Sequence, residues 1–119
     1  MKAFTKLKVW EKSHRLTLDI YKVTKGFPRD ELYGLTAQFR RSCSSIPANI
    51  AEGCGRNGDA EFARFLQIAL GSASELEYHL LLARDLGLLN DLDYERLRSE
   101  TKEVKQMLTS FIKKLKAES

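Results

Sequence analysis

Two histidines and two cysteines are the residues of this 119-residue chain best suited to metal or nucleophilic chemistry. Glu75 and His79 are four residues apart, whereas ferritin-like di-metal bundles use paired Glu-x-x-His motifs with further carboxylates. The four potential zinc ligands lack the close Cys-x-x-Cys spacing of structural zinc sites; they are His14, Cys43, Cys54 and His79. The sequence contains no phosphate-binding glycine loop preceded by a strand pattern, and its serines do not indicate a catalytic triad. We therefore expect no enzyme activity, no metal and no cofactor.

The stretch "RRSCSSIPANIAEG" places a proline among small residues in the middle of a helical apolar pattern. A proline inside a helix removes one backbone donor and clashes with the carbonyl four residues earlier, here that of Cys43, which costs about 3 kcal/mol unless the helix bends. Because the apolar spacing continues on both sides of Pro47, we expect a helix kinked near this residue. Two abutting helices, the second capped by Ser44 or Ser45, are the alternative.

Polar residues beside this proline have structural and functional interpretations. Adjacent arginines point about 100° apart on a helix, so Arg40 and Arg41 cannot share one environment. We expect at least one of them to form an ion pair with an acid, either Glu52, Glu75 or Glu77. Asn49 and Glu52 more simply satisfy backbone or arginine partners around the kink than form a polar site.

Small residues recur in a second stretch, "ALGSAS" at 69–74, where a glycine gives up about 1 kcal/mol of helix propensity. Two such zones at similar heights predict close approach of two helices. Intramolecular packing and a subunit interface both explain them, and the sequence leaves the choice open.

Apolar residues recur at helical spacing in four segments, and no alternating strand pattern occurs. The segments run from Val9 to Phe27, from Leu32 to Ile50, from Asn57 or Asp59 to Gly87, and from Asn90 or Asp91 to Leu115. The last segment follows a heptad pattern, formed by Tyr94, Leu97, Thr101, Val104, Leu108, Phe111 and Leu115. Short links between such helices predict an all-α, up-down-up-down antiparallel four-helix bundle, with residues 1–119 forming one domain.

The net charge of +4 is concentrated near the N-terminus, where residues 1–30 hold eight Lys and Arg against three acidic residues. Such an excess attracts phosphate backbones, although a solvated helix face explains it as well. The candidate nucleic-acid-binding residues are Lys6, Lys8, Lys12, Arg15, Arg40, Arg41 and Arg56. The chain has no apolar run of membrane-spanning length, no secretory leader pattern and only two cysteines, so we expect a reduced, cytoplasmic protein.

Four stretches together resemble one known family over nearly the whole chain: "LKVWEKSHRL", "YGLTAQFRRSCSSIPANIAEG", "EFARFLQIALGSASELE" and "ARDLGLL". The chain resembles the four-helix bundle family named for the protein encoded in 23S rRNA intervening sequences. The resemblance implies a small cytosolic bacterial bundle that assembles as a ring of five subunits. It also implies relatedness to the accessory protein of diversity-generating retroelements, a pentamer that binds reverse transcriptase and nucleic acid.

The family motif, carried over by position, falls on fourteen residues of this chain: Trp10, Gly34, Arg40, Arg41, Ser45, Pro47, Asn49, Glu52, Gly53, Arg56, Phe62, Gly71, Ser72 and Glu75. The chain departs from the usual pattern at Phe39, at Cys54 and at Asn57-Gly58. The last two departures weaken the expectation of a strongly basic loop between the second and third helices. Trp10 is more readily interpreted as a packing or interface anchor than as a platform for base stacking.

Two functions from different classes are compatible with this sequence. The first is a homo-oligomeric module that binds RNA or a nucleic-acid-associated protein, with the basic first helix contacting phosphates and a ring multiplying weak contacts. The alternative is a protein-interaction scaffold with no role in nucleic-acid binding. Neither predicts a membrane or a small-molecule substrate as a partner.

Overall fold

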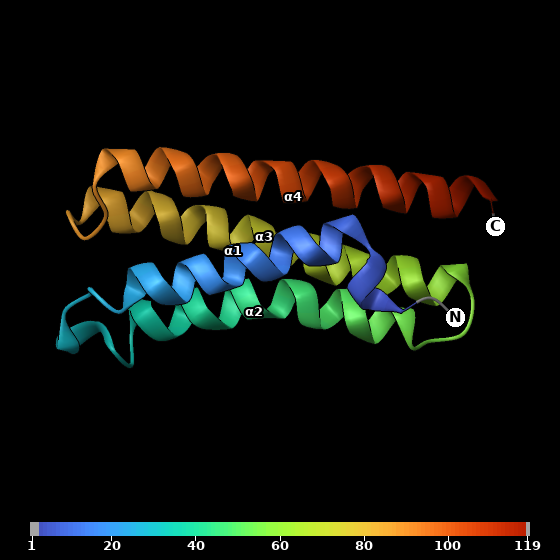
Figure 1. Ribbon diagram of the computed structural model, residues 1–119, viewed down its shortest axis with the longest axis horizontal. Coiled ribbons are helices and arrows are strands. Elements are labelled where there is room, and N and C mark those ends of the chain that lie inside the picture. The colour runs from blue at the N-terminus through green and yellow to red at the C-terminus, as the bar shows by residue number, and fades with distance from the viewer. Residues whose placement is uncertain (1–2, 119) are drawn as a thin grey trace.

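The structure is a computed structural model that describes residues 3–118, in which four long helices are joined by short links (Figure 1). The elements are the short 3-10 helices η1 (Phe4–Lys6) and η2 (Arg29–Glu31) and the α-helices α1 (Lys8–Thr24), α2 (Leu35–Cys54), α3 (Asp59–Asp85) and α4 (Asp91–Glu118). Within the described residues there is no β-strand. The predicted all-α class is confirmed.

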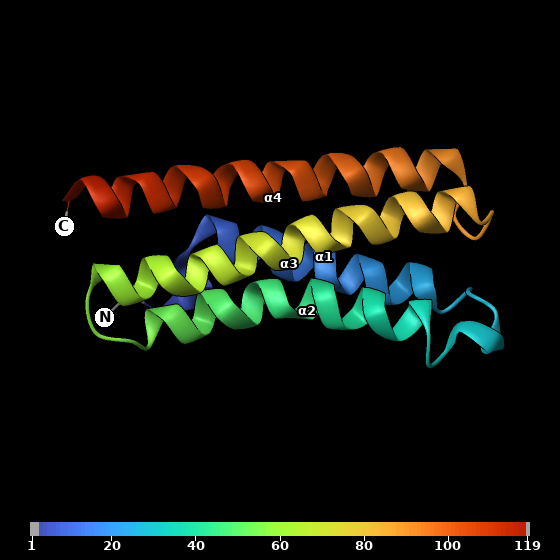
Figure 2. The same ribbon diagram turned by 180° about the vertical axis from the view of Figure 1, so that it is seen from behind.

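The four α-helices form an elongated antiparallel bundle measuring 46 × 22 × 20 Å (Figures 1 and 2). Ion pairs fix the register of α1 against α4: Lys12 lies 2.5 Å from Glu103, and Arg96 pairs with Asp19. Because the earlier residue of α1 pairs with the later residue of α4, these two helices run in opposite directions. The predicted four-helix bundle is therefore confirmed.

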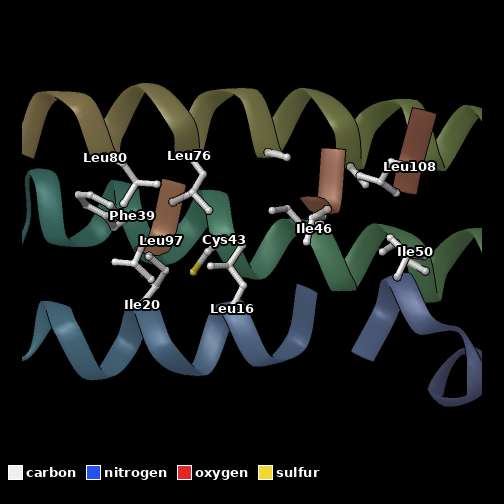
Figure 3. Packing of buried hydrophobic residues seen from close by; sticks show 14 of the residues in the cluster. Leu16, Ile20, Phe39, Cys43, Ile46, Ile50, Leu76, Leu80, Leu97 and Leu108 are labelled. Atoms are coloured by element: carbon white, nitrogen blue, oxygen red, sulfur yellow. The ribbon is translucent and has the colours of Figure 1, made fainter. Parts of the chain in front are cut away.

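The core is a continuous apolar column to which all four helices contribute (Figure 3). Its largest fully buried side chains are Leu16, Ile20, Phe39, Ile46, Ile50, Leu66, Leu76, Leu80, Leu97, Leu108 and Val104. These residues come from the predicted apolar stripes, at spacings of three and four residues. The apolar stripe of each helix therefore faces the other helices, and most charged residues remain on the outside.

The helix α2 continues through Pro47 without a break, so the alternative of two abutting helices is wrong. Its axis is bowed in both views, in keeping with the bend expected of a helix that contains proline (Figures 1 and 2). The carbonyl of Cys43 has no amide to accept at position 47. The buried hydroxyl of Thr17 supplies a donor instead, with its Oγ1 3.1 Å from that carbonyl oxygen and 2.8 Å from the carbonyl oxygen of Ser13. A side chain of α1 thus compensates for the proline of α2.

Several helix ends differ from the prediction. Leu32 lies outside α2 and is 45% exposed, because Gly34, with φ −108° and ψ −110°, interrupts the helical backbone before Leu35. The N-cap of α3 is Gly58 at φ +86°, a conformation that glycine adopts freely, rather than Asn57 or Asp59.

The apolar stripe of α4 also differs at its end. Ile112 is buried there, while Phe111 is only half-buried. The apolar stripe of a straight helix drifts from a strict heptad by about 20° per repeat, so the neighbouring residue takes the core position. At the other end, the Asn90 cap is confirmed, since Asn90 Oδ1 accepts the amide of Asp93 at 2.7 Å. No helix within residues 3–118 is sufficiently long and apolar to cross a membrane.

Candidate functional site

The basic residues predicted to bind nucleic acid lie at both ends of the bundle and differ in how they are paired. On α1, Lys12 pairs with Glu103 of α4, and the largely exposed Arg15 lies 3.7 Å from Glu11. Lys6 and Lys8 form no ion pair with any described residue. Two of the four predicted basic residues near the N-terminus are therefore unpaired.

The three predicted arginines of the central motif have partners within the molecule. The Nε of Arg40 donates to Thr24 Oγ1 at 3.1 Å, and its guanidinium lies 4.7 Å from the ring centre of Tyr21. Arg40 therefore holds the last turn of α1 against α2, a contact that sequence reasoning missed. Arg41 pairs with Glu75 of α3, which confirms one of the predicted ion pairs.

Arg56 completes this set at the C-terminal end of α2. It lies 3.1 Å from Glu52, one turn earlier, and 5.1 Å from the ring centre of Phe65. Both members of the Glu52–Arg56 pair are about half exposed, so the pair contributes little stability. These interactions give each arginine of the central motif a structural role.

Sequence reasoning missed two lysines, Lys113 and Lys114, near the C-terminus of α4. Like Lys6 and Lys8, they are exposed and form no ion pair with a described residue. The antiparallel register brings the start of α1 and the last turns of α4 to the same end of the bundle (Figure 1). We name these four residues the lysine end. The run "KKLK" at 113–116 is the sequence feature that could have identified Lys113 and Lys114.

The lysine end spans a short length of the bundle axis. From the paired level of Lys12 and Glu103, Lys8 lies about 6 Å and Lys114 about 16 Å toward the end of the bundle, at 1.5 Å per helical residue. Their levels thus differ by about 10 Å, close to one Debye length at 0.1 M salt.

Arg41 belongs to a polar cluster that links α2 and α3. His79 Nε2 lies 3.6 Å from Glu75 Oε2, and His79 Nδ1 lies 3.3 Å from the fully buried Ser42 Oγ. Burial lowers the pKa of His79 below its ordinary 6.5; the Glu75 carboxylate opposes this shift, and the Arg41 charge adds to it. Ser42 is fully buried, so its hydroxyl is not accessible to a substrate, and the cluster packs α2 against α3.

A second polar cluster crosses the same pair of helices beside the proline. The hydroxyls of Ser45 and Ser72 lie 2.9 Å apart, one from each helix. Asn49 Nδ2 donates to the carbonyl of Ser45 at 2.8 Å and lies 3.0 Å from its hydroxyl. The expectation that Asn49 satisfies backbone near the proline is confirmed.

The glycines of the motif have different surroundings. A Cβ on Gly53 would lie 2.9 Å from Phe62 Cδ1 and 2.9 Å from Phe65 Cβ, so α2 and α3 approach each other too closely for a side chain. A Cβ on Gly71 would meet no atom within 4 Å, and Gly71 is exposed. Packing inside the bundle therefore explains Gly53 but not Gly71.

The outward side of α2 carries small and uncharged residues almost throughout. We name this surface the α2 outer face; it consists of Ala37, Gln38, Arg41, Ser44, Ser45, Ala48, Asn49 and Glu52. Its two charged residues are neutralised by the Arg41–Glu75 and Glu52–Arg56 pairs described above. Gly71 and Ser72 of α3 adjoin it through the contact between Ser72 and Ser45. This surface lacks the charge expected of a solvated helix face.

The remaining motif residues, Trp10 and Gly34, stabilise the ends of helices. Trp10 is half-buried, stacks on His14 with ring centres 4.8 Å apart, and meets the edge of Phe4 at 5.1 Å. It thereby holds η1 against α1, which favours the packing interpretation. Gly34 is the residue that begins α2, and Glu31 Oε1 accepts the amide of Leu35 there.

The cysteines and acidic residues form no centre suited to nucleophilic or metal chemistry among residues 3–118. Cys43 and Cys54 are both buried as thiols. Burial raises the pKa of the Cys43 thiol to about 12, which keeps it protonated and unreactive at neutral pH. No group of three or more His, Cys, Asp or Glu side chains in this part of the chain is arranged to hold a metal ion.

The described geometry agrees with what is known of related chains. A protein of unknown function from the S23 ribosomal protein family of Bacteroides thetaiotaomicron has a similar solved structure. It is 31% identical to this chain, with a TM-score of 0.80 over 88% of this chain and 98% of its own. No protein with a curated description matches. The family model of the 23S rRNA-intervening sequence protein matches residues 5–110, and the chain belongs to that family.

Proposed function

We propose that this chain is a non-enzymatic, cytoplasmic bundle that assembles with copies of itself and binds RNA through the lysine end. The single observation that carries the RNA part is the unpaired state of Lys6, Lys8, Lys113 and Lys114 among the described residues. A lysine already paired with a carboxylate must give up that partner to bind a phosphate, whereas an unpaired lysine need not. The four lysines of the lysine end can therefore bind phosphates without first losing a carboxylate partner.

Self-assembly is supported by the α2 outer face. An exposed helix normally carries charged residues on its solvent side, yet this face has two, each neutralised by a neighbour. Depletion of charge is the compositional mark of interface cores. A ring of five copies, as the family resemblance implies, would repeat the lysine end five times. Repetition raises the effective concentration at each further contact, so weak phosphate contacts add up.

Binding to a structured RNA, measured by fluorescence anisotropy across a salt series, tests the RNA part. We expect affinity to fall steeply with salt, because each neutralised phosphate releases counterions. Lys8→Glu should weaken binding and reduce the salt slope by about one for each phosphate that the variant no longer neutralises. The matched control is Lys102→Glu, an equal change of charge at an exposed lysine of α4 that does not belong to the lysine end.

Lys12→Glu is a poorer test, because it would place a carboxylate against Glu103 and break an ion pair of the bundle. Absence of binding at low salt, or equal weakening by Lys8→Glu and Lys102→Glu, contradicts the RNA proposal. The same α2 outer face would then favour the second candidate, a scaffold that docks another protein.

A further inference from the structure

A cleft of about 510 Å³ opens at the end of the bundle where α2 turns into α3. Residues from three elements line it, among them Gly53, Arg56, Asn57, Phe62, Phe111 and Leu115. Its volume lies in the range of roughly 300–1,000 Å³ that is typical of sites for small ligands.

The cleft exists because α1 is shorter than α4. α1 has 17 residues and begins at Lys8, whereas α4 has 28 and continues to Glu118. Since Lys12 lies level with Glu103, the last turns of α4 extend beyond the first turn of α1. The core-facing side of those turns, with Phe111 and Leu115, consequently lines the cleft.

The walls of the cleft offer the groups that bind a nucleobase. Phe62 and Phe111 form an edge-to-face pair with ring centres 5.2 Å apart, and both are half-buried, so part of each ring remains accessible. Aromatic rings stack on bases of any sequence. The amide of the exposed Asn57 and the guanidinium of Arg56 can reach the polar edge of a base from the rim.

The charged groups at this site favour the base of a nucleotide over its phosphate. Asp59 and Glu118 also line the cleft, and their carboxylates repel a phosphate but accept hydrogen bonds from the amino groups of a base. Lys114 follows Phe111 by three residues and therefore lies on the same side of α4. A strand whose phosphates contact the lysine end can thus reach the cleft with a base.

We propose that this cleft takes up one unpaired nucleobase of a single strand whose phosphates lie along the lysine end. The proposal rests on the proposed function, because it needs the strand that the lysine end would hold. It makes the chain a reader of single-stranded segments and not of duplexes, whose bases are stacked and paired.

Two probes with equal phosphate number test this proposal. One is a ten-nucleotide oligoadenylate and the other an abasic ribose-phosphate strand of the same length, each measured by anisotropy with wild type and with Phe111→Leu. Loss of base stacking should weaken binding of the oligoadenylate by about fivefold or more and leave the abasic strand within about twofold. Phe111→Tyr, which keeps an aromatic ring, should bind like wild type.

Phe27→Leu is the matched control. Phe27 is half-buried and forms an edge-to-face pair with Phe39 at 5.6 Å, but it lies at the opposite end of the bundle. It should leave both probes unaffected. Asn57→Ala is a second variant that leaves the core intact, and it should weaken the oligoadenylate alone. A deoxyadenylate strand beside the ribo strand shows whether the 2′-hydroxyl contributes as well as the base.

The outcomes separate this inference from the function on which it rests. If wild type binds neither probe, the RNA proposal fails and takes the inference with it. If wild type binds both probes with a steep salt dependence and Phe111→Leu weakens neither, or both equally, only the nucleobase inference is overturned. A thermal melt of each variant confirms that it is folded before binding is compared.

Discussion

The helices α2 and α4 lie on opposite sides of the bundle and present contrasting surfaces (Figures 1 and 2). α4 carries 13 charged residues among its 28, and several of its exposed acids and bases form ion pairs with one another or with neighbouring helices. α2 carries three charged residues among its 20, and serine and alanine make up half of the α2 outer face. A helix with a highly charged outward side thus lies across the bundle from one whose outward side is mostly uncharged.

The helices α2 and α4 also differ in how they pack against the rest of the bundle. Both helices pack through stripes of large side chains, but α2 also depends on close approach and on polar groups supplied by its neighbours. Gly53 allows α3 to approach α2, and Thr17 supplies the hydrogen bond that the proline removes. α2 is therefore the helix whose sequence is most constrained by its surroundings. Each of the following predictions tests one part of this contrast.

The largest expected effect on stability comes from Gly53→Ala. The added Cβ meets Phe65 Cβ at 2.9 Å, so the two helices must separate, at a cost of about 1–3 kcal/mol. Gly71→Ala is the matched control on α3, where the space is open, and it should stabilise the isolated bundle by up to about 1 kcal/mol. Urea unfolding midpoints measure both. A Gly53→Ala protein as stable as wild type would show that close approach is not required.

Thr17→Val should cost about 1–3 kcal/mol, because it leaves the buried carbonyl of Cys43 without a donor. The control is Thr101→Val on α4, which removes a hydroxyl whose partner, the carbonyl of Leu97, also has its helical amide donor. Both changes keep the side-chain shape, and both sites are buried. Comparison of the two unfolding free energies isolates the proline compensation, and equal costs for the two variants would refute it.

A smaller effect concerns pH and the cluster between α2 and α3. The pKa of His79 is lowered by burial, so below pH 6.5 the unfolded chain binds the proton more readily than the folded one. Stability should therefore fall as the pH decreases from about 7 to 5, by at most about 1.4 kcal/mol per pH unit. His79→Gln should flatten this part of the profile. Parallel profiles for wild type and His79→Gln would contradict this origin.

The fold was predictable because the spacing of apolar residues marks its helices, from Val9 through Leu16 and Ile20 to the heptad of α4. The ends were less predictable. Gly34 and Gly58 set the starts of α2 and α3 through backbone angles that depend on the course of the whole chain. No pattern of residue types near Leu32 shows that the helix begins only after it.

The candidate site was predictable only in part. Helix geometry predicted that one of the two adjacent arginines pairs with Glu52, Glu75 or Glu77, and the Arg41–Glu75 pair confirms it. The contact of Arg40 with Thr24 and Tyr21 depends on the height at which α1 ends beside α2, which sequence does not state. The gathering of Lys113 and Lys114 with Lys8 likewise depends on the register of α1 against α4. Contacts between residues of different helices, unlike contacts within one helix, could be identified only from the structure.

The measurement that tests the central claim most directly is the molar mass of the native protein by light scattering, for wild type and for one variant of each face. The α2 outer face predicts that wild type has a multiple of the 13.6 kDa chain mass and that Ala48→Glu has the mass of one chain. Ser99→Glu, on the exposed side of α4, should keep the mass of the wild type. A monomeric wild type, or an assembly that persists in Ala48→Glu, would contradict the account.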